Sequence, residues 1–246
     1  MGERVQHGPA TKTFATTHWS VIQAARDGSS AAARDALNHL CATYWQPVYA
    51  FIRRSGSNAE DARDLTQGFF AALLADDSFA RADRDKGRFR SFLLGALKHY
   101  LVDEQRRAQT RKRGGDHELV PLDVALAETR YGIEAVAAVS PEAEYDRTWA
   151  LSVLDRALGR FREESDLAGR AVLFDALKGF LTGDKPAAGY RSVAAQLRIT
   201  EGAAKMTVTR MRQRFRVLVQ QELSQTVLTA AELEEELRAF LRILRG

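Results

Sequence analysis

Residues 190–216 read YRSVAAQLRITEGAAKMTVTRMRQRFR, and this stretch decides the fold of the C-terminal half of the chain. Apolar residues at helical spacing predict two helices with a turn at Ile199, and Thr200 is expected to cap the second. That helix carries one apolar stripe: Val208, Met211, Phe215, Leu218 and Val219. Its remaining surface is largely basic, which is typical of a helix-turn-helix that enters the major groove of DNA. The alternative is a solvated basic helix in a small bundle.

Helical spacing continues along most of the chain, whereas the alternation typical of strands is scarce. Pro47 is expected in the first turn of a helix that follows a separate one over residues 30–44. The chain is therefore predicted to be all-α, with two small helical domains. Its predicted parts are a flexible N-terminus (1–16), a first domain (17–113), a linker (114–145), a helix-turn-helix domain (146–223) and a C-terminal helical extension (224–246). The other predicted helices cover residues 17–26, 58–74, 89–107, 146–161, 167–181, 191–198, 201–223 and 230–244.

The composition limits the class of protein. The 246 residues are 45% apolar and 28% charged, as in ordinary soluble globular proteins. A net charge of +4 allows a polyanionic partner without requiring one. The single cysteine, Cys41, lies in an apolar stretch and is expected to fill the core. The sequence has neither a membrane-length apolar run nor a secretory signal, so we expect a cytoplasmic location.

Sequence motifs for catalysis are missing. The five histidines are scattered without the spacing of metal ligands, and no glycine-rich phosphate-binding loop occurs. The stretch Asp83–Gly87 resembles a calcium loop, but its glycine comes one place early and the downstream glutamate is missing, so a charged surface turn is predicted. We therefore predict that the protein is not an enzyme and needs no cofactor or metal.

A second basic stretch, RRAQTRKRGG at residues 106–115, directly follows the helix predicted over 89–107. The aromatic residues of that helix include Phe89, Phe92 and Tyr100. Cations beside aromatic rings can hold single-stranded nucleic acid, because unpaired bases stack on the rings. The alternative is that these aromatic residues belong to the core, since they have helical spacing.

Three stretches together resemble the sigma factors of the extracytoplasmic-function (ECF) group. Residues 61–70 (DARDLTQGFF) are similar to the helix that docks on the clamp helices of the largest subunit of RNA polymerase. Residues 89–107 are similar to the helix that reads and opens the minus-ten element, and residues 190–215 to the domain that binds the minus-thirty-five element. The likeness is greatest to a lineage-restricted subgroup with KGRFRSFLL (residues 86–94) and a basic KRGG (residues 112–115).

This resemblance implies a sigma region 2-like domain and a sigma region 4-like domain that direct promoter recognition and DNA melting for transcription initiation. The implied partners are core RNA polymerase, promoter DNA as duplex and as non-template single strand, and a protein kinase or an anti-sigma protein. The residues implied in polymerase binding are Asp61, Asp64, Leu65, Gln67 and Phe69. Those implied in minus-ten binding are Lys98, His99, Asp103, Arg106 and Arg107. Those implied in minus-thirty-five binding are Lys205, Thr209, Arg210 and Arg212.

The chain departs from the family pattern at three positions. Arg63 and Gly68 stand where the docking helix usually has acids, which is expected to weaken polymerase binding by ~1–3 kcal/mol. Phosphorylation of Thr66 would restore negative charge to this helix. Arg198 replaces the usual glycine of the helix-turn-helix turn, and a left-handed conformation there costs about 1 kcal/mol, so a remodelled turn is an alternative.

The helix predicted over 230–244 is additional to the two domains. We expect Leu233, Leu237 and Leu241 to pack onto the second domain. Alternatively, its acids, Glu232 and those at 234–236, form a regulatory lid over the DNA-binding residues.

Two other functions remain open at this stage. One is a stand-alone helix-turn-helix regulator that binds duplex DNA without polymerase, and the other is an adaptor whose basic faces bind acidic proteins. The adaptor would show no steeply salt-dependent DNA binding.

Overall fold

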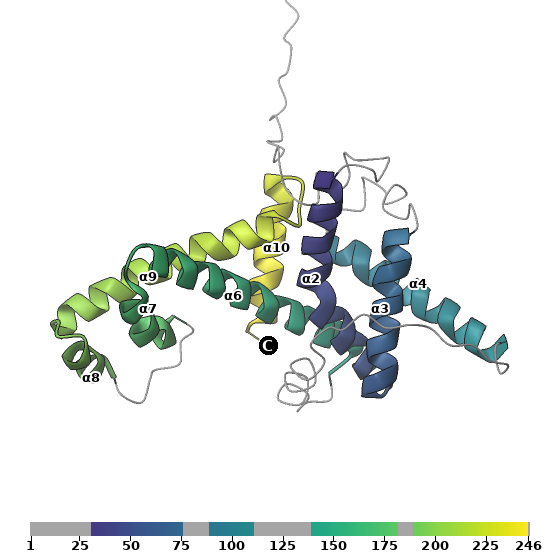
Figure 1. Cartoon of the computed structure of the whole chain (residues 1–246), viewed down its shortest axis with the longest axis horizontal. Coiled ribbons are helices and arrows are strands. Elements are labelled where there is room, and N and C mark those ends of the chain that lie inside the picture. Colours follow the sequence, from purple (N-terminus) through teal and green to yellow (C-terminus); the bar gives the residue numbers. More distant parts are fainter. Residues whose placement is uncertain (1–30, 76–88, 111–138, 182–188, 246) are drawn as a thin grey trace, which may run out of the picture. The chain divides into compact units, whose positions relative to one another are not determined.

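The computed structural model describes residues 31–75, 89–110, 139–181 and 189–245. Its regular elements are helices, in the order α2 (Ala31–Arg54), α3 (Ala59–Ala75), α4 (Phe89–Thr110), α6 (Pro141–Leu167), α7 (Ala171–Leu177), the 3-10 helix η3 (Lys178–Phe180), α8 (Gly189–Gln196), α9 (Glu201–Ser224) and α10 (Ala230–Ile243) (Figure 1). The all-α prediction is thus confirmed. The helix predicted over 17–26, the turn at 83–87, the basic residues 111–113 and most of the predicted linker lie outside the described residues.

The chain divides into two compact units, whose bounds differ from the predicted domains. The first comprises Met1–Leu151 and Ser224–Gly246, and the second comprises Ser152–Leu223. The first turns of α6 and the whole of α10 thus fold with the N-terminal helices. Within the part described, the first unit contains α2, α3, α4, the start of α6 and α10.

Helix α2 is continuous, so the prediction of two helices separated before Pro47 was wrong. Proline removes one hydrogen bond inside a helix, at a cost of about 3 kcal/mol. Here Tyr44, Val48 and Tyr49 around the proline are almost completely buried. Their burial offsets the cost of the proline, because each large apolar side chain contributes about 1.5–3 kcal/mol.

Aromatic side chains connect the helices of the first unit. Tyr44 of α2 contacts Phe89 of α4 edge to face, with ring centroids 5.0 Å apart. Phe51 of α2 contacts Tyr145 of α6 in the same way at 6.4 Å. The start of α6 is fixed by Ser140, whose Oγ accepts a hydrogen bond from the Ala143 N–H, an N-cap immediately before a proline in the first helical turn.

The second unit contains the predicted helix-turn-helix in α8 and α9. Arg198 in the turn has φ of 54°, so the left-handed conformation is kept despite the missing glycine. Thr200 caps α9, because its Oγ1 accepts the Ala203 N–H at 3.1 Å. The predicted apolar stripe of α9 is buried, which confirms the prediction: Val208, Met211, Phe215, Leu218 and Val219.

Helix α10 begins as predicted and folds with the first unit. Thr229 and Glu232 form a capping box at its start. Its buried residues are Glu236 and Phe240, and the Phe240 ring contacts Trp149 of the first unit edge to face at 5.9 Å. The buried side of the helix is centred on these two residues; of the three leucines expected to pack, Leu233 and Leu237 are half-buried and Leu241 is exposed.

Candidate nucleic-acid interface

The four residues of α9 that are predicted to bind the minus-thirty-five element differ in their contacts. Lys205 pairs with Glu201 at 2.7 Å and lies over the Tyr190 ring, 5.7 Å from its centroid. Thr209 is exposed, and its hydroxyl donates to the Lys205 carbonyl at 3.0 Å. Arg210 is exposed on the same helix. These residues lie on the solvent side of α9, opposite its buried stripe.

Arg212 has a structural role that the sequence did not reveal. Its Nε and Nη2 donate to the Phe180 carbonyl oxygen at 3.1 and 2.7 Å. This carbonyl is at the end of η3, where helical carbonyls lack intrahelical partners, so Arg212 caps that short helix. This contact occupies Nε and Nη2 of the exposed Arg212, and the role of Arg212 in DNA binding stays a prediction.

Met206 was missed in the sequence. It is 59% exposed and lies one helical turn before Arg210 on α9. An exposed large apolar side chain on a basic helix suits a thymine methyl group in the major groove. Its position outside the buried stripe was the available signal.

Helix α4 carries the predicted minus-ten residues on one exposed side. Its buried side is formed by Phe89, Leu93 and Leu97, at intervals of four residues. The predicted residues are all exposed: Lys98, His99, Asp103, Arg106 and Arg107. Burial of Phe89 shows that this ring belongs to the core, as in the alternative stated for the aromatic residues.

Ion pairs organise this exposed side. Lys98 pairs with Glu142 of α6 at 2.7 Å, and this hydrogen bond lowers the pKa of Glu142 below its ordinary value. Arg106 lies 3.7 Å from Asp103, and Arg107 lies 2.7 Å from Glu104. Both arginines are exposed, so a phosphate can compete for them at little cost.

Helix α3 presents only part of the predicted polymerase-binding set. Asp61 and Asp64 are exposed, and Leu65 and Gln67 are half-buried. Phe69, in contrast, is 2% exposed and contacts the rings of Phe70 and Tyr100, with centroids 5.2 and 5.6 Å away. Its predicted role in polymerase binding is disfavoured, because it fills the core between α3 and α4.

Asp61 also stabilises the start of α3. The Asn58 side chain caps the helix by accepting the Asp61 N–H at 2.8 Å and donating to the Asp61 carboxylate at 2.8 Å. An acid in this first turn is favourable for the helix dipole. A change at Asp61 would therefore affect helix stability as well as surface charge.

Thr66 lies on the buried side of α3. It is 0% exposed, and its hydroxyl donates to the Ala62 carbonyl at 2.6 Å. A kinase cannot reach a buried hydroxyl without unfolding this part of the helix. The structure therefore argues against phosphorylation of Thr66.

Gly68 forms a notch for Tyr100 between α3 and α4. A Cβ atom at position 68 would overlap the Tyr100 hydroxyl, and the next nearest atom, Tyr100 Cζ, would lie at 3.6 Å. Burial raises the pKa of Tyr100 to about 12. The glycine at the position of a missing acid thus leaves room for the Tyr100 hydroxyl in the contact between the two helices.

Other kinds of site have little support in the described residues. Among them, no group of three or more His, Cys, Asp or Glu residues is placed to hold a metal ion. Over the same residues, no helix combines the length and apolar character needed to cross a membrane. Burial raises the pKa of the Cys41 thiol to about 12, so this cysteine is unreactive at neutral pH.

Comparison with known proteins gives one match. A family model described as "ECF sigma factor" matches residues 16–225, which is most of the chain and includes α3, α4, α8 and α9. No curated protein and no solved structure matches the chain.

Proposed function

The chain belongs to the ECF sigma factor family, and from this premise we propose that α4 captures and opens the minus-ten element while α9 holds the minus-thirty-five element. Members of this family act in transcription initiation with RNA polymerase and promoter DNA as partners. DNA melting by such a protein requires binding energy and no covalent chemistry.

One observation carries the proposal: α4 buries one side through Phe89, Leu93 and Leu97 and leaves the opposite side exposed and largely polar. That side has cations for the phosphate backbone and His99 for stacking against a base. Unstacked bases bound here would be removed from the duplex equilibrium. The free energy of binding then offsets the cost of separating the strands.

For the minus-thirty-five element, we propose base and phosphate contacts from exposed residues of α9. Arg210 suits a guanine edge through its two-pronged guanidinium, and Met206 suits a thymine methyl. Lys205 and Thr209 are placed on the same side, with Lys205 held by its ion pair to Glu201. Phosphate contacts position the helix, whereas base contacts give sequence preference.

For polymerase binding, we propose the exposed carboxylates Asp61 and Asp64, with Gln67 and Leu65 at the edge of the contact. Arg63 lies 3.4 Å from Asp64 and reduces the negative potential of this surface. Binding to a basic partner is therefore expected to be weaker than with an acid at position 63.

The test is reconstituted transcription with core polymerase and promoter fragments selected from a library. Permanganate reactivity of thymines reports melting. His99→Ala and Arg106→Ala should each reduce melting by about fivefold or more, equivalent to ~1 kcal/mol or more. Arg238→Ala is the matched control, because Arg238 is an exposed arginine of the same unit that pairs only along its own helix with Glu234 at 3.2 Å.

Two results would remove the whole proposal, and a third would remove the role of α4. One is failure of the wild-type protein to associate with core polymerase. The other is sequence-specific duplex binding that is complete without polymerase, which would instead support the stand-alone regulator. Equal melting by the control and the α4 variants would exclude α4 as the minus-ten reader.

A further inference from the structure

The first turn of α4 is held by parts of the chain that come much later in the sequence. The Phe89 N–H, at the first position of the helix, donates to the Thr226 carbonyl at 3.2 Å. The Tyr145 hydroxyl donates to the Arg90 carbonyl at 3.2 Å. The segment between α9 and α10, together with the start of α6, therefore forms the seat of α4.

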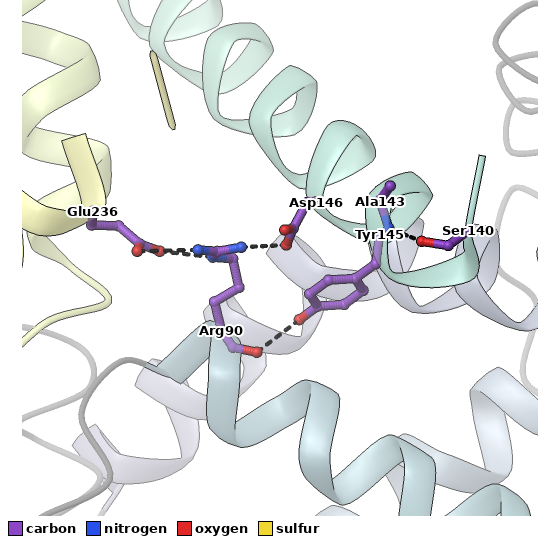
Figure 2. Close-up of polar contacts among 6 residues, drawn as sticks. All are labelled: Arg90, Ser140, Ala143, Tyr145, Asp146 and Glu236. Atoms are coloured by element: carbon purple, nitrogen blue, oxygen red, sulfur yellow. Dashed lines mark hydrogen bonds and ion pairs between the residues drawn. The ribbon is translucent and has the colours of Figure 1, made fainter. Parts of the chain in front are cut away.

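Arg90 is the centre of this seat. Its Nε and Nη2 donate to the two carboxylate oxygens of Glu236 at 2.9 and 3.3 Å, and its Nη1 donates to Asp146. Figure 2 shows the guanidinium between Glu236 of α10 and Asp146 of α6. The guanidinium carbon also lies 4.4 Å from the centre of the Trp149 ring. Four contacts thus fix one side chain in one orientation.

Burial makes this arrangement highly dependent on its partners. The side chains of Arg90 and Glu236 are 10% and 0% exposed. Burial lowers the pKa of Arg90, but the hydrogen bond and charge of Glu236, with the charge of Asp146, raise it above its ordinary value. A buried carboxylate that loses its cation is strongly destabilised. Docking of α10 therefore requires Arg90, and the orientation of Arg90 requires α10.

We propose that α10 is a positioning element of the minus-ten reader: Glu236, with Asp146, fixes Arg90 and thereby sets the direction of α4. This inference rests on the proposed function of α4. Arg106 lies roughly 24 Å along the helix from Arg90, at about 1.5 Å per residue. A tilt of only about 5° at the first turn would therefore move Arg106 by about 2 Å, enough to misplace a DNA contact.

Other contacts agree with a positioning role. Glu236 accepts a hydrogen bond from Arg90, Glu232 belongs to the capping box, and Glu234 forms an ion pair with Arg238. Lys98, farther along α4, is also tied to the start of α6 through Glu142. Helix α10 and the start of α6 thus both fix the position of α4.

The test uses full-length protein with Arg90→Gln, Glu236→Gln, the double variant, and Glu234→Gln as control. Glu234 is on the same helix but exposed, so its change removes only a surface ion pair. Holoenzyme affinity is measured for a single-stranded non-template minus-ten oligonucleotide and for a minus-thirty-five duplex. Urea unfolding at the temperature of the binding assay shows whether each variant is folded under those conditions.

We expect Arg90→Gln and Glu236→Gln to lower minus-ten affinity at least fivefold while duplex affinity stays within twofold of wild type. The double variant should recover most of the loss of Arg90→Gln, because Glu236→Gln removes the buried negative charge that Arg90→Gln leaves without its cation. The Glu234→Gln control should match wild type at both sites. If Arg90→Gln does not fold, Arg90→Lys and Glu236→Gln decide the question.

Folded variants that bind the minus-ten strand like wild type would overturn this inference alone. A parallel loss at both DNA sites would also overturn it, because that is the behaviour of a role in stability only. If the wild-type holoenzyme itself does not bind the minus-ten strand, the proposed function fails and this inference fails with it.

Discussion

Replacement of Gly68 by alanine tests whether α3 and α4 meet at this residue. In isolation, alanine would stabilise a helix by about 1 kcal/mol relative to glycine. In this protein, the new Cβ would overlap the Tyr100 hydroxyl. Overpacking of this kind costs typically 1–3 kcal/mol. We therefore expect Gly68→Ala to be neutral or destabilising by up to about 2 kcal/mol.

The Tyr100→Phe background removes the overlapping oxygen and leaves the ring carbon at 3.6 Å, an ordinary contact. Gly68→Ala should there stabilise the protein by about 1 kcal/mol, so the two changes should be coupled by ~1–3 kcal/mol. Urea unfolding of the four proteins measures this coupling. Additive effects would refute the packing argument. Gly68→Asp separates the explanations further: a missing acid predicts tighter polymerase binding, whereas the notch predicts loss of stability.

Three further results are expected. Arg210→Ala should weaken binding of a minus-thirty-five duplex by about 1–3 kcal/mol in a titration, whereas Arg212→Ala should mainly lower the thermal stability, because it releases the Phe180 carbonyl; the reverse pattern would contradict this assignment. The pKa of Tyr100 is about 12 in the folded protein and near 10 when unfolded, so stability should fall as pH rises from about 10 to 12, and Tyr100→Phe should lose less in urea unfolding at pH 9 and 11. Thr66→Glu should destabilise α3 and give no gain in core-polymerase affinity, since Thr66 is fully buried; tighter binding would restore the case for phosphorylation.

Local patterns in the sequence were sufficient for the helix-turn-helix. The apolar stripe of α9, the cap at Thr200 and the left-handed turn at Arg198 depend on residues within a few positions of one another. The exposed side of α4 could be predicted for the same reason. Helical periodicity separates buried from exposed positions without knowledge of the partner surface.

Roles that depend on distant residues could not be predicted in this way. Arg212 looks like any other cation of a recognition helix until the Phe180 carbonyl is placed against it. Phe69 matches a docking motif, but its burial is decided by Tyr100 of the next helix. The continuity of α2 through Pro47 likewise depends on how much apolar surface its neighbours cover.

Helix α10 shows most clearly why charge was misleading. Its leucines at 233, 237 and 241 predicted an apolar contact, and its acids suggested a lid over the DNA-binding residues as the alternative. The structure buries the acid Glu236 beside Phe240, because Arg90 supplies the matching charge and two hydrogen bonds. An apolar stripe could pack on many surfaces, whereas a buried carboxylate tolerates only a surface with a correctly placed cation. The ion pair therefore selects where α10 docks, and Phe240 and its neighbours supply the apolar contact once it is there.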